Sequence, residues 1–175
     1  MINETILAII IAFAVSAILC PVVIPFLHKL KFGQQVREDG PQAHLKKQGT
    51  PTMGGLVFLT AVVITSLLYI RDYPRIIPVL FMTVGFGIIG FLDDYEKLRH
   101  KQNLGLSAKM KFLLQLLAAT CFLLLLRFTG YLSPNLYIPF WNLDLEIPTA
   151  VYMIFAAFVI VGCVNAVNLT DGVDG

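Results

Sequence analysis

Long uninterrupted runs of apolar residues, separated by shorter polar segments, dominate the chain. The runs show neither the apolar stripe of an amphipathic helix nor the alternation of a half-buried strand. Because a helix rises about 1.5 Å per residue, roughly 20 apolar residues cross a hydrocarbon core of about 30 Å. The pattern therefore predicts an all-α integral membrane protein with spans at about 6–27, 53–70, 76–92, 112–131 and 149–167.

The segment between the last two runs, 131–148, has a different pattern, in which apolar and acidic residues alternate. The alternating residues are Leu143, Asp144, Leu145, Glu146 and Ile147. This alternation predicts a short strand or hairpin. Tyr137 and Trp141 are typical of a membrane–water interface, so we expect the segment to lie there in a structural role.

Composition supports the membrane class, since 57% of residues are hydrophobic and only 14% are charged, against about 25% charged in globular proteins. We interpret residues 1–175 as one membrane domain. The first run has no Lys or Arg before it and no small-residue cleavage site after it. We therefore expect a retained span and not a secretory signal.

The basic residues predict the orientation. Ten of the thirteen fall in two connections, 28–52 and 93–111. Cytoplasmic connections carry the excess of Lys and Arg in membrane proteins. We therefore expect both connections to be cytoplasmic, together with 168–175, and the amino terminus to lie outside.

Two acidic clusters stand at the ends of apolar runs on this predicted cytoplasmic side. Asp93 and Asp94 follow the third run, which has no charge of its own. A lone carboxylate in hydrocarbon costs several kcal/mol or more, so adjacent acids at a membrane surface indicate a functional site that holds a cation.

The second cluster follows the fifth run, where Asn165, Asn168, Asp171 and Asp174 recur at every third position. Glycine favours a helix end, so Gly172 predicts Asn165 and Asn168 on the last helical turn and both aspartates in a glycine-rich loop. Backbone N–H groups of such a loop can approach a ligand. The alternative is a polar helix cap that binds nothing.

The first connection also leaves two interpretations open. Its lysines can simply enforce topology in a solvated linker. Alternatively, its turn-forming residues hold Lys47 and Thr52 near an anionic ligand, because ammonium and hydroxyl groups suit phosphate. Composition alone does not choose between them.

Gly85, Gly87 and Gly90 match the dinucleotide-binding pattern, but they lie inside a predicted span without the strand–helix–strand context that this pattern requires. We interpret them as sites of close helix packing.

Another function class, an ion-coupled membrane transporter, is the alternative to an enzyme. Transporter sites lie near the bilayer midplane at broken helices. The carboxylates here gather at the ends of the runs instead. Localising Mg2+ or a nucleotide at the cytoplasmic surface would separate the two interpretations.

Three ordered motifs carry a family resemblance. They are Gly49-Thr-Pro-Thr-Met-Gly-Gly55, Asp93-Asp94-Tyr-Glu-Lys97 and Asn165-Ala-Val-Asn168-Leu-Thr-Asp171-Gly-Val-Asp174-Gly175. Together they resemble the polyprenyl-phosphate N-acetylhexosamine-1-phosphate transferases, and segment 32–55 resembles the phospho-N-acetylmuramoyl-pentapeptide transferase branch. The resemblance implies a bacterial inner-membrane enzyme that transfers phospho-MurNAc-pentapeptide from its UDP donor to undecaprenyl phosphate. The products would be lipid I and UMP, and Mg2+ the cofactor.

The resemblance also implies residue roles. Asp93, Asp94 and Lys97 would be catalytic, with both aspartates as metal ligands. The substrate-binding residues would be Lys47, Thr52, Lys109, Asn165, Asn168, Asp171, Gly172 and Asp174. The implied partners are the lipid bilayer, the two substrates and a second copy in a homodimer, with no nucleic acid.

The family's chains are longer than this one, and their second half supplies another cytoplasmic Asp, a metal ligand, and a His-rich loop. We therefore expect this chain to be the amino-terminal half of a roughly ten-helix fold, with about 20 residues per span. We expect it to be inactive by itself.

Overall fold

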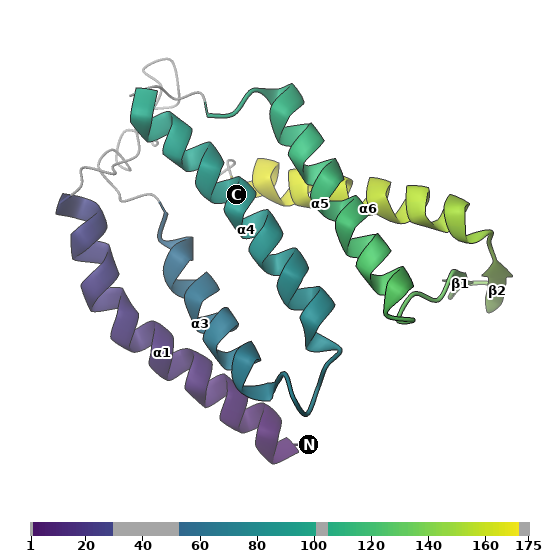
Figure 1. The fold of residues 1–175 in the computed structure, drawn as a ribbon, viewed down its shortest axis with the longest axis horizontal. Coiled ribbons are helices and arrows are strands. Elements are labelled where there is room, and N and C mark those ends of the chain that lie inside the picture. The colour runs from purple at the N-terminus through teal and green to yellow at the C-terminus, as the bar shows by residue number, and fades with distance from the viewer. Residues whose placement is uncertain (1, 30–52, 101–104, 172–175) are drawn as a thin grey trace. The chain divides into compact units, whose positions relative to one another are not determined.

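The computed structural model of the chain describes residues 2–29, 53–100 and 105–171 (Figure 1). The described helices are α1 (Ile2–Lys29), α3 (Gly55–Tyr69), α4 (Ile76–His100), α5 (Ala108–Phe128) and α6 (Thr149–Asp171). Two strands, β1 (Asn135–Ile138) and β2 (Leu143–Glu146), lie between α5 and α6. The predicted class, an all-α membrane protein, is confirmed. By length and composition, α1, α4, α5 and α6 are able to span a membrane, and α3 is a shorter apolar helix.

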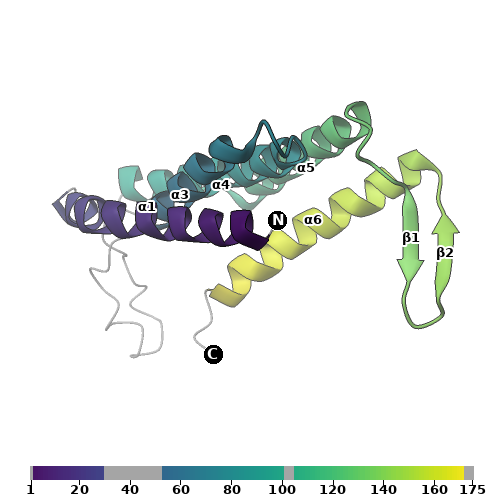
Figure 2. The ribbon, with the colours of Figure 1, turned by 90° about the horizontal axis from the view of Figure 1, so that it is seen from below.

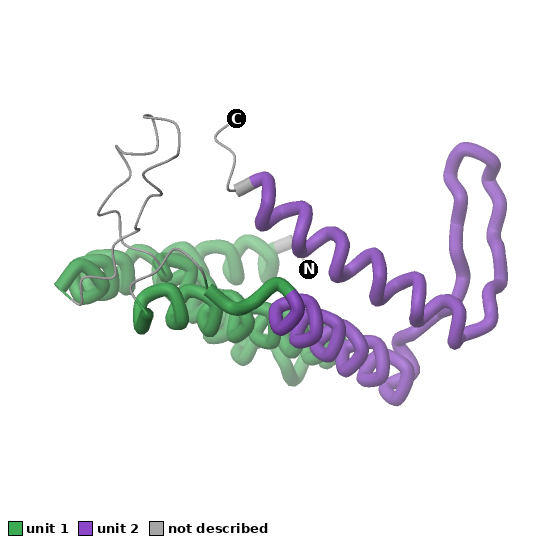
Figure 3. The backbone as a smooth tube through the Cα atoms, turned by 90° about the horizontal axis from the view of Figure 1, so that it is seen from above, with its two compact units in different colours: residues 1–108 green, residues 109–175 purple. Residues whose placement is uncertain are grey.

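The chain divides into two compact units, residues 1–108 and 109–175, which Figure 3 colours separately. In the first unit α3 packs against both α1 and α4, and Figure 1 shows the three helices side by side. Large apolar side chains on these helices remain exposed, including Phe13 and Phe58. Such faces suit a lipid environment, in which a helix satisfies its own backbone hydrogen bonds.

Close packing at the glycine pattern is confirmed at one of its three positions. A Cβ atom on Gly87 would lie 2.6 Å from Leu59 Cδ2 of α3, so a side chain there would force Leu59 to move. Apart from its own helical neighbours, a Cβ built at Gly85 or Gly90 would have no described atom within 4 Å. The packing role therefore belongs to Gly87.

Helix α4 continues beyond the predicted apolar run, which ends at Leu92, as far as His100. Side-chain pairs one turn apart stabilise this polar extension. Lys97 pairs with two acids of the preceding turn, and His100 Nδ1 lies 3.0 Å from Glu96 Oε2. The first part of the predicted connection at 93–111 is therefore helical.

In the second unit, a hairpin connects α5 with α6 (Figure 2). Helix α5 ends before Gly130, whose φ of 73° lies in the left-handed region that glycine adopts without strain. The amides of Tyr131 and Leu132 donate to the Leu126 carbonyl and close the last turn. Strands β1 and β2 then pair antiparallel, which confirms the predicted hairpin.

Candidate functional site

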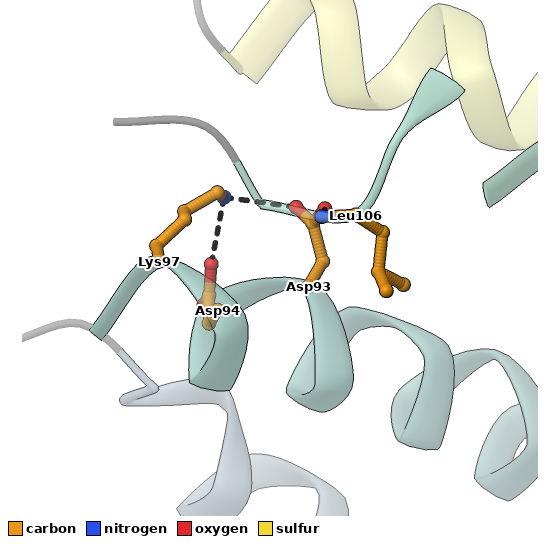
Figure 4. A network of polar contacts seen from close by, with 4 residues as sticks. All are labelled: Asp93, Asp94, Lys97 and Leu106. Atoms are coloured by element: carbon orange, nitrogen blue, oxygen red, sulfur yellow. Dashed lines mark hydrogen bonds and ion pairs between the residues drawn. The ribbon is translucent and has the colours of Figure 1, made fainter. Parts of the chain in front are cut away.

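The last turns of α4 bring three charged side chains together. Lys97 is four residues after Asp93 and three after Asp94, so on the helix surface it lies beside both. Lys97 Nζ lies 2.9 Å from Asp93 Oδ2 and 2.9 Å from Asp94 Oδ1 (Figure 4). The single ammonium group thus bridges both carboxylates. Two negative charges and one positive charge leave the cluster with a net negative charge of one.

The chain that follows α4 returns to cover Asp93. The Leu106 amide donates to Asp93 Oδ1 over 3.0 Å, and Figure 4 shows this segment beside the carboxylate. A Cβ atom on Gly105 would lie 2.5 Å from Asp93 Oδ1 and 2.6 Å from the Asp93 carbonyl oxygen. Only glycine fits this approach without a shift of the backbone. Asp93 is consequently 7% exposed.

The adjacent aspartates therefore differ in what they can bind. Asp93 uses one oxygen for Lys97 and the other for the Leu106 amide. Asp94 contacts Lys97 through Oδ1, and its side chain is 33% exposed against 10% for Asp93. Asp94 is the carboxylate with room for an external ligand, and Asp93 fixes the segment at 105–106 beside it.

The donor chemistry decides what kind of metal site these residues fit. Within residues 2–29, 53–100 and 105–171, no group of three or more His, Cys, Asp or Glu side chains could hold a metal ion. That excludes a closed cage built from the described side chains. Mg2+ normally takes one or two carboxylates and completes its shell with water and substrate phosphates. Asp94 fits such an open site, whereas both oxygens of Asp93, the other expected ligand, already have partners.

Asn165 has a partner that was not predicted from the sequence. Its Nδ2 donates to Gln115 Oε1 on α5 over 2.6 Å and to the Val161 carbonyl over 2.8 Å. This amide pair links two helices of the second unit, and it does so away from solvent, because Gln115 is 2% exposed. The signal in the sequence was a lone amide, Gln115, within the apolar run at 112–131. Interhelical amide bonds of this kind are common in membranes.

The other predicted residues of α6 lie further along the helix. Asn168 is exposed on its last turn, whereas Asn165 lies on the turn before. The prediction that Asp171 lies in a loop is wrong, because α6 continues through Asp171 as its last residue. A helix can extend to the residue before a glycine, and here Gly172 follows directly.

The remaining predicted residues lie in or near the polar connections. Lys109 is exposed in the first turn of α5. Lys47, Thr52, Gly172 and Asp174 fall outside the described residues. Directly after Thr52, the buried Met53 has a φ of 67°. This left-handed conformation costs an L-residue about 1–2 kcal/mol.

Comparison with known proteins defines the class first. Residues 76–175, more than half of the chain, match the family described as glycosyl transferase family 4. The chain therefore belongs to glycosyl transferase family 4. Residues 47–59 also match the description phospho-N-acetylmuramoyl-pentapeptide-transferase signature 1.

The relatives described next are enzymes of one kind. The chain is 50% identical over 172 residues to the phospho-N-acetylmuramoyl-pentapeptide-transferase of Staphylococcus saprophyticus, covering 95% of this chain and 53% of that protein. The same enzyme of Caldicellulosiruptor bescii is 49% identical over 172 residues, covering 98% and 53%. The chain thus spans about half the length of the curated relatives it matches.

Proposed function

We propose that this chain forms part of a phosphoglycosyl transferase. The enzyme moves phospho-MurNAc-pentapeptide from UDP-MurNAc-pentapeptide to undecaprenyl phosphate, forming lipid I and UMP during peptidoglycan synthesis. The observation that carries the proposal is the cluster of Asp93, Asp94 and Lys97, with its buried carboxylate, at the polar end of an apolar helix. A lipid acceptor requires a site at the membrane surface, and a nucleotide donor requires that site to face the cytoplasm.

In this proposal the residues of the cluster have different roles. Lys97 neutralises charge on the donor pyrophosphate, because an ammonium group suits phosphate oxygens. Asp94 offers an oxygen to Mg2+, and Asp93 holds the cluster and the segment at 105–106 in position. When bound, Mg2+ would stabilise the negative charge that develops during phosphoryl transfer.

A phosphate monoester with a second pKa of about 6 is mostly dianionic near neutral pH. The acceptor phosphate therefore needs little help from a base. Positioning of metal and acceptor is the role that we assign to the aspartates.

The nucleotide part of the donor is assigned to the first connection and to the end of α6. Lys47 and Thr52 would contact the diphosphate, with Lys109 as a further cation. Asn168, Asp171, Gly172 and Asp174 would contact the ribose and uracil, since carboxylates accept bonds from hydroxyl and N–H groups. Asn165 supports this group by fixing α6 to α5. The enzyme would lie in the bacterial inner membrane as a homodimer, with its amino terminus outside and its active site facing the cytoplasm.

A fusion protein tests this function directly. Gly175 would be followed by the part of the Staphylococcus saprophyticus relative that this chain does not cover. With Mg2+, undecaprenyl phosphate and UDP-MurNAc-pentapeptide, the fusion protein is expected to release UMP and form lipid I. The 175-residue chain alone is expected to release no UMP above background.

The controls separate the assigned centre from the rest of the fusion protein. Chelation of Mg2+ and the substitution Asp94→Asn should each abolish most UMP release. Glu96→Gln removes an acid from the same helical turn but not from the cluster, so its rate should stay near the parent value. A fully active Asp94→Asn fusion protein would refute the assignment. Substantial UMP release by the chain alone would refute a different expectation, namely that the chain is inactive by itself.

A further inference from the structure

The hairpin formed by β1 and β2 has two chemically different faces. Directly opposed residues of an antiparallel pair lie on the same face, and the face alternates along each strand. One face carries the pairs Leu136–Leu145 and Ile138–Leu143. The other carries Asn135–Glu146 and Tyr137–Asp144. All four apolar strand residues therefore share one side, and both acids lie on the opposite side.

The turn of the hairpin presents two aromatic residues. The Trp141 amide donates to the Ile138 carbonyl over 3.3 Å, and Asn142 follows with a φ of 47°. Tyr137 Oη donates to Asn142 Oδ1 over 2.8 Å and fixes this turn. Within it, Phe140 is 93% exposed and Trp141 is 78% exposed. The structure thus holds two large aromatic side chains at the tip in contact with solvent.

The position of the hairpin places it at a membrane boundary. It connects the end of α5 with the start of α6, and both helices are long and apolar enough to span a membrane. Figure 2 shows that the strands run across the direction of α6 and do not continue it. If α5 and α6 cross the bilayer, the hairpin lies along the membrane surface.

The hairpin would be only marginally stable with its apolar face in water, which indicates that this face is covered. An isolated two-stranded hairpin is marginally stable in water, yet Leu143 and Leu145 are 45% and 38% exposed. Trp and Tyr are enriched at membrane interfaces because their rings have apolar and polar parts. The acids on the opposite face would stay in water and avoid the cost of desolvation. A lipid surface therefore matches both faces.

We propose that this hairpin is an interfacial lipid-binding element. Its apolar face and the tip residues Phe140 and Trp141 lie in the boundary between headgroups and acyl chains, and Asp144 and Glu146 face water. The element anchors the connection between α5 and α6 to the bilayer. This inference depends neither on the proposed transfer reaction nor on which side of the membrane the hairpin occupies.

Trp141 makes the proposal testable, because it is the only tryptophan of the chain. The 175-residue protein would be reconstituted into phosphatidylcholine–phosphatidylglycerol vesicles with iodide available on both sides. We expect the Trp141 emission to be blue-shifted. Lipids brominated near the headgroup end of the acyl chain should quench this emission. Iodide should cause a much smaller loss.

Two further variants test the orientation of the faces. In a Trp141→Phe background, Leu145→Trp and Asp144→Trp place the probe on adjacent residues of β2 that lie on opposite faces. Leu145→Trp should respond to brominated lipid, and Asp144→Trp should respond to iodide. Far-UV circular dichroism of each variant verifies that the helices are retained.

Water or protein in contact with this surface, in place of lipid, would give different quenching results. Strong iodide quenching of Trp141 would show that the tip extends into water. Insensitivity to both quenchers would show that protein covers it, either a second copy or another part of a longer chain. Either result would overturn the proposal, as would identical quenching of Leu145→Trp and Asp144→Trp.

Discussion

Two acidic residues of the first unit, Glu4 and Asp93, bond to segments distant in sequence, and they differ in their surroundings. Glu4, in the first turn of α1, is exposed and accepts a 2.6 Å hydrogen bond from Tyr73 Oη. Asp93, near the end of α4, is buried beside Lys97 and accepts a bond from the Leu106 amide. Both acids join segments distant in sequence, but Asp93 does so away from water, whereas Glu4 is exposed.

This difference has an energetic meaning. An exposed hydrogen bond contributes little, because water replaces it when it breaks. A buried carboxylate must be compensated by charge and hydrogen bonds, and its loss disturbs every group arranged around it. We therefore expect substitutions near Asp93 to affect activity strongly, and substitutions near Glu4 to have small local effects.

The largest effect is expected for Asp93→Asn in the fusion protein. This change removes a charge that holds Lys97 and the segment at 105–106, and loss of one electrostatic group commonly costs about 100-fold to 1000-fold in rate. UMP release should fall by that factor at every pH tested. Full recovery at higher pH would instead support a proton-removing role for Asp93.

Gly105→Ala should have a smaller effect through the same carboxylate. The added Cβ would meet Asp93 Oδ1 at 2.5 Å, so the segment must shift, and a displacement of about 1 Å in an active site can cost up to about 100-fold. Gly90→Ala is the matched control, because a Cβ there has no described atom within 4 Å. Equal UMP release by the two variants would show that the contact at Gly105 has no role in positioning.

The amide pair of the second unit provides an intermediate case, buried but uncharged. Asn165→Ala should destabilise the protein by about 1 kcal/mol, since interhelical hydrogen bonds in membranes contribute roughly that much. Denaturant titration of Asn165→Ala, Gln115→Ala and the double variant measures the coupling. Additive losses would show that the hydrogen bond between these residues contributes nothing to stability.

The smallest effect is expected for substitution of Glu4, the exposed acid. The hydrogen bond to the Glu4 carboxylate raises the pKa of Tyr73 above its ordinary value of 10.0. Its stabilisation is present below pH 10.0 and is lost as the pH rises through the raised pKa. Glu4→Gln should return the Tyr73 pKa toward 10.0 without changing UMP release by the fusion protein. Ultraviolet titration, with Tyr73→Phe subtracted to isolate this phenol, measures the shift; an unchanged pKa would contradict the bond.

The helices and the hairpin were predictable because their causes are local. An apolar run must form a helix in lipid to satisfy its own amides, and the alternation around Leu143 and Leu145 is a direct strand signal. The i, i+3 and i, i+4 spacing also places Lys97 beside Asp93 and Asp94 once that segment is helical.

The contacts that distinguish the two aspartates were not predictable from the sequence. The hydrogen bond from Leu106 to Asp93 depends on a return of the backbone over 13 residues, and no periodic pattern encodes such a return. Gly105 was therefore missed as the residue that permits it. The Gln115 partner of Asn165 lies 50 residues away on another helix. The helical position of Asp171 was mispredicted because Gly172 indicates where a helix ends only within one or two residues.

The central claim is that the transfer centre lies at the end of α4, and the position of the bound metal tests it most directly. Native tyrosines close to this centre and far from it can report that position. Tyr95 follows Asp94, and Tyr73 contacts Glu4. The fusion protein would carry fluorotyrosine, with resonances assigned by Tyr→Phe variants and Mn2+ replacing Mg2+, since both prefer oxygen ligands. With UDP-MurNAc-pentapeptide bound, we predict that Mn2+ broadens the Tyr95 fluorine resonance, leaves Tyr73 sharp, and has no effect on either in Asp94→Asn. Broadening at Tyr73, or a Tyr95 resonance that stays sharp, would contradict the assignment of the transfer centre to the end of α4.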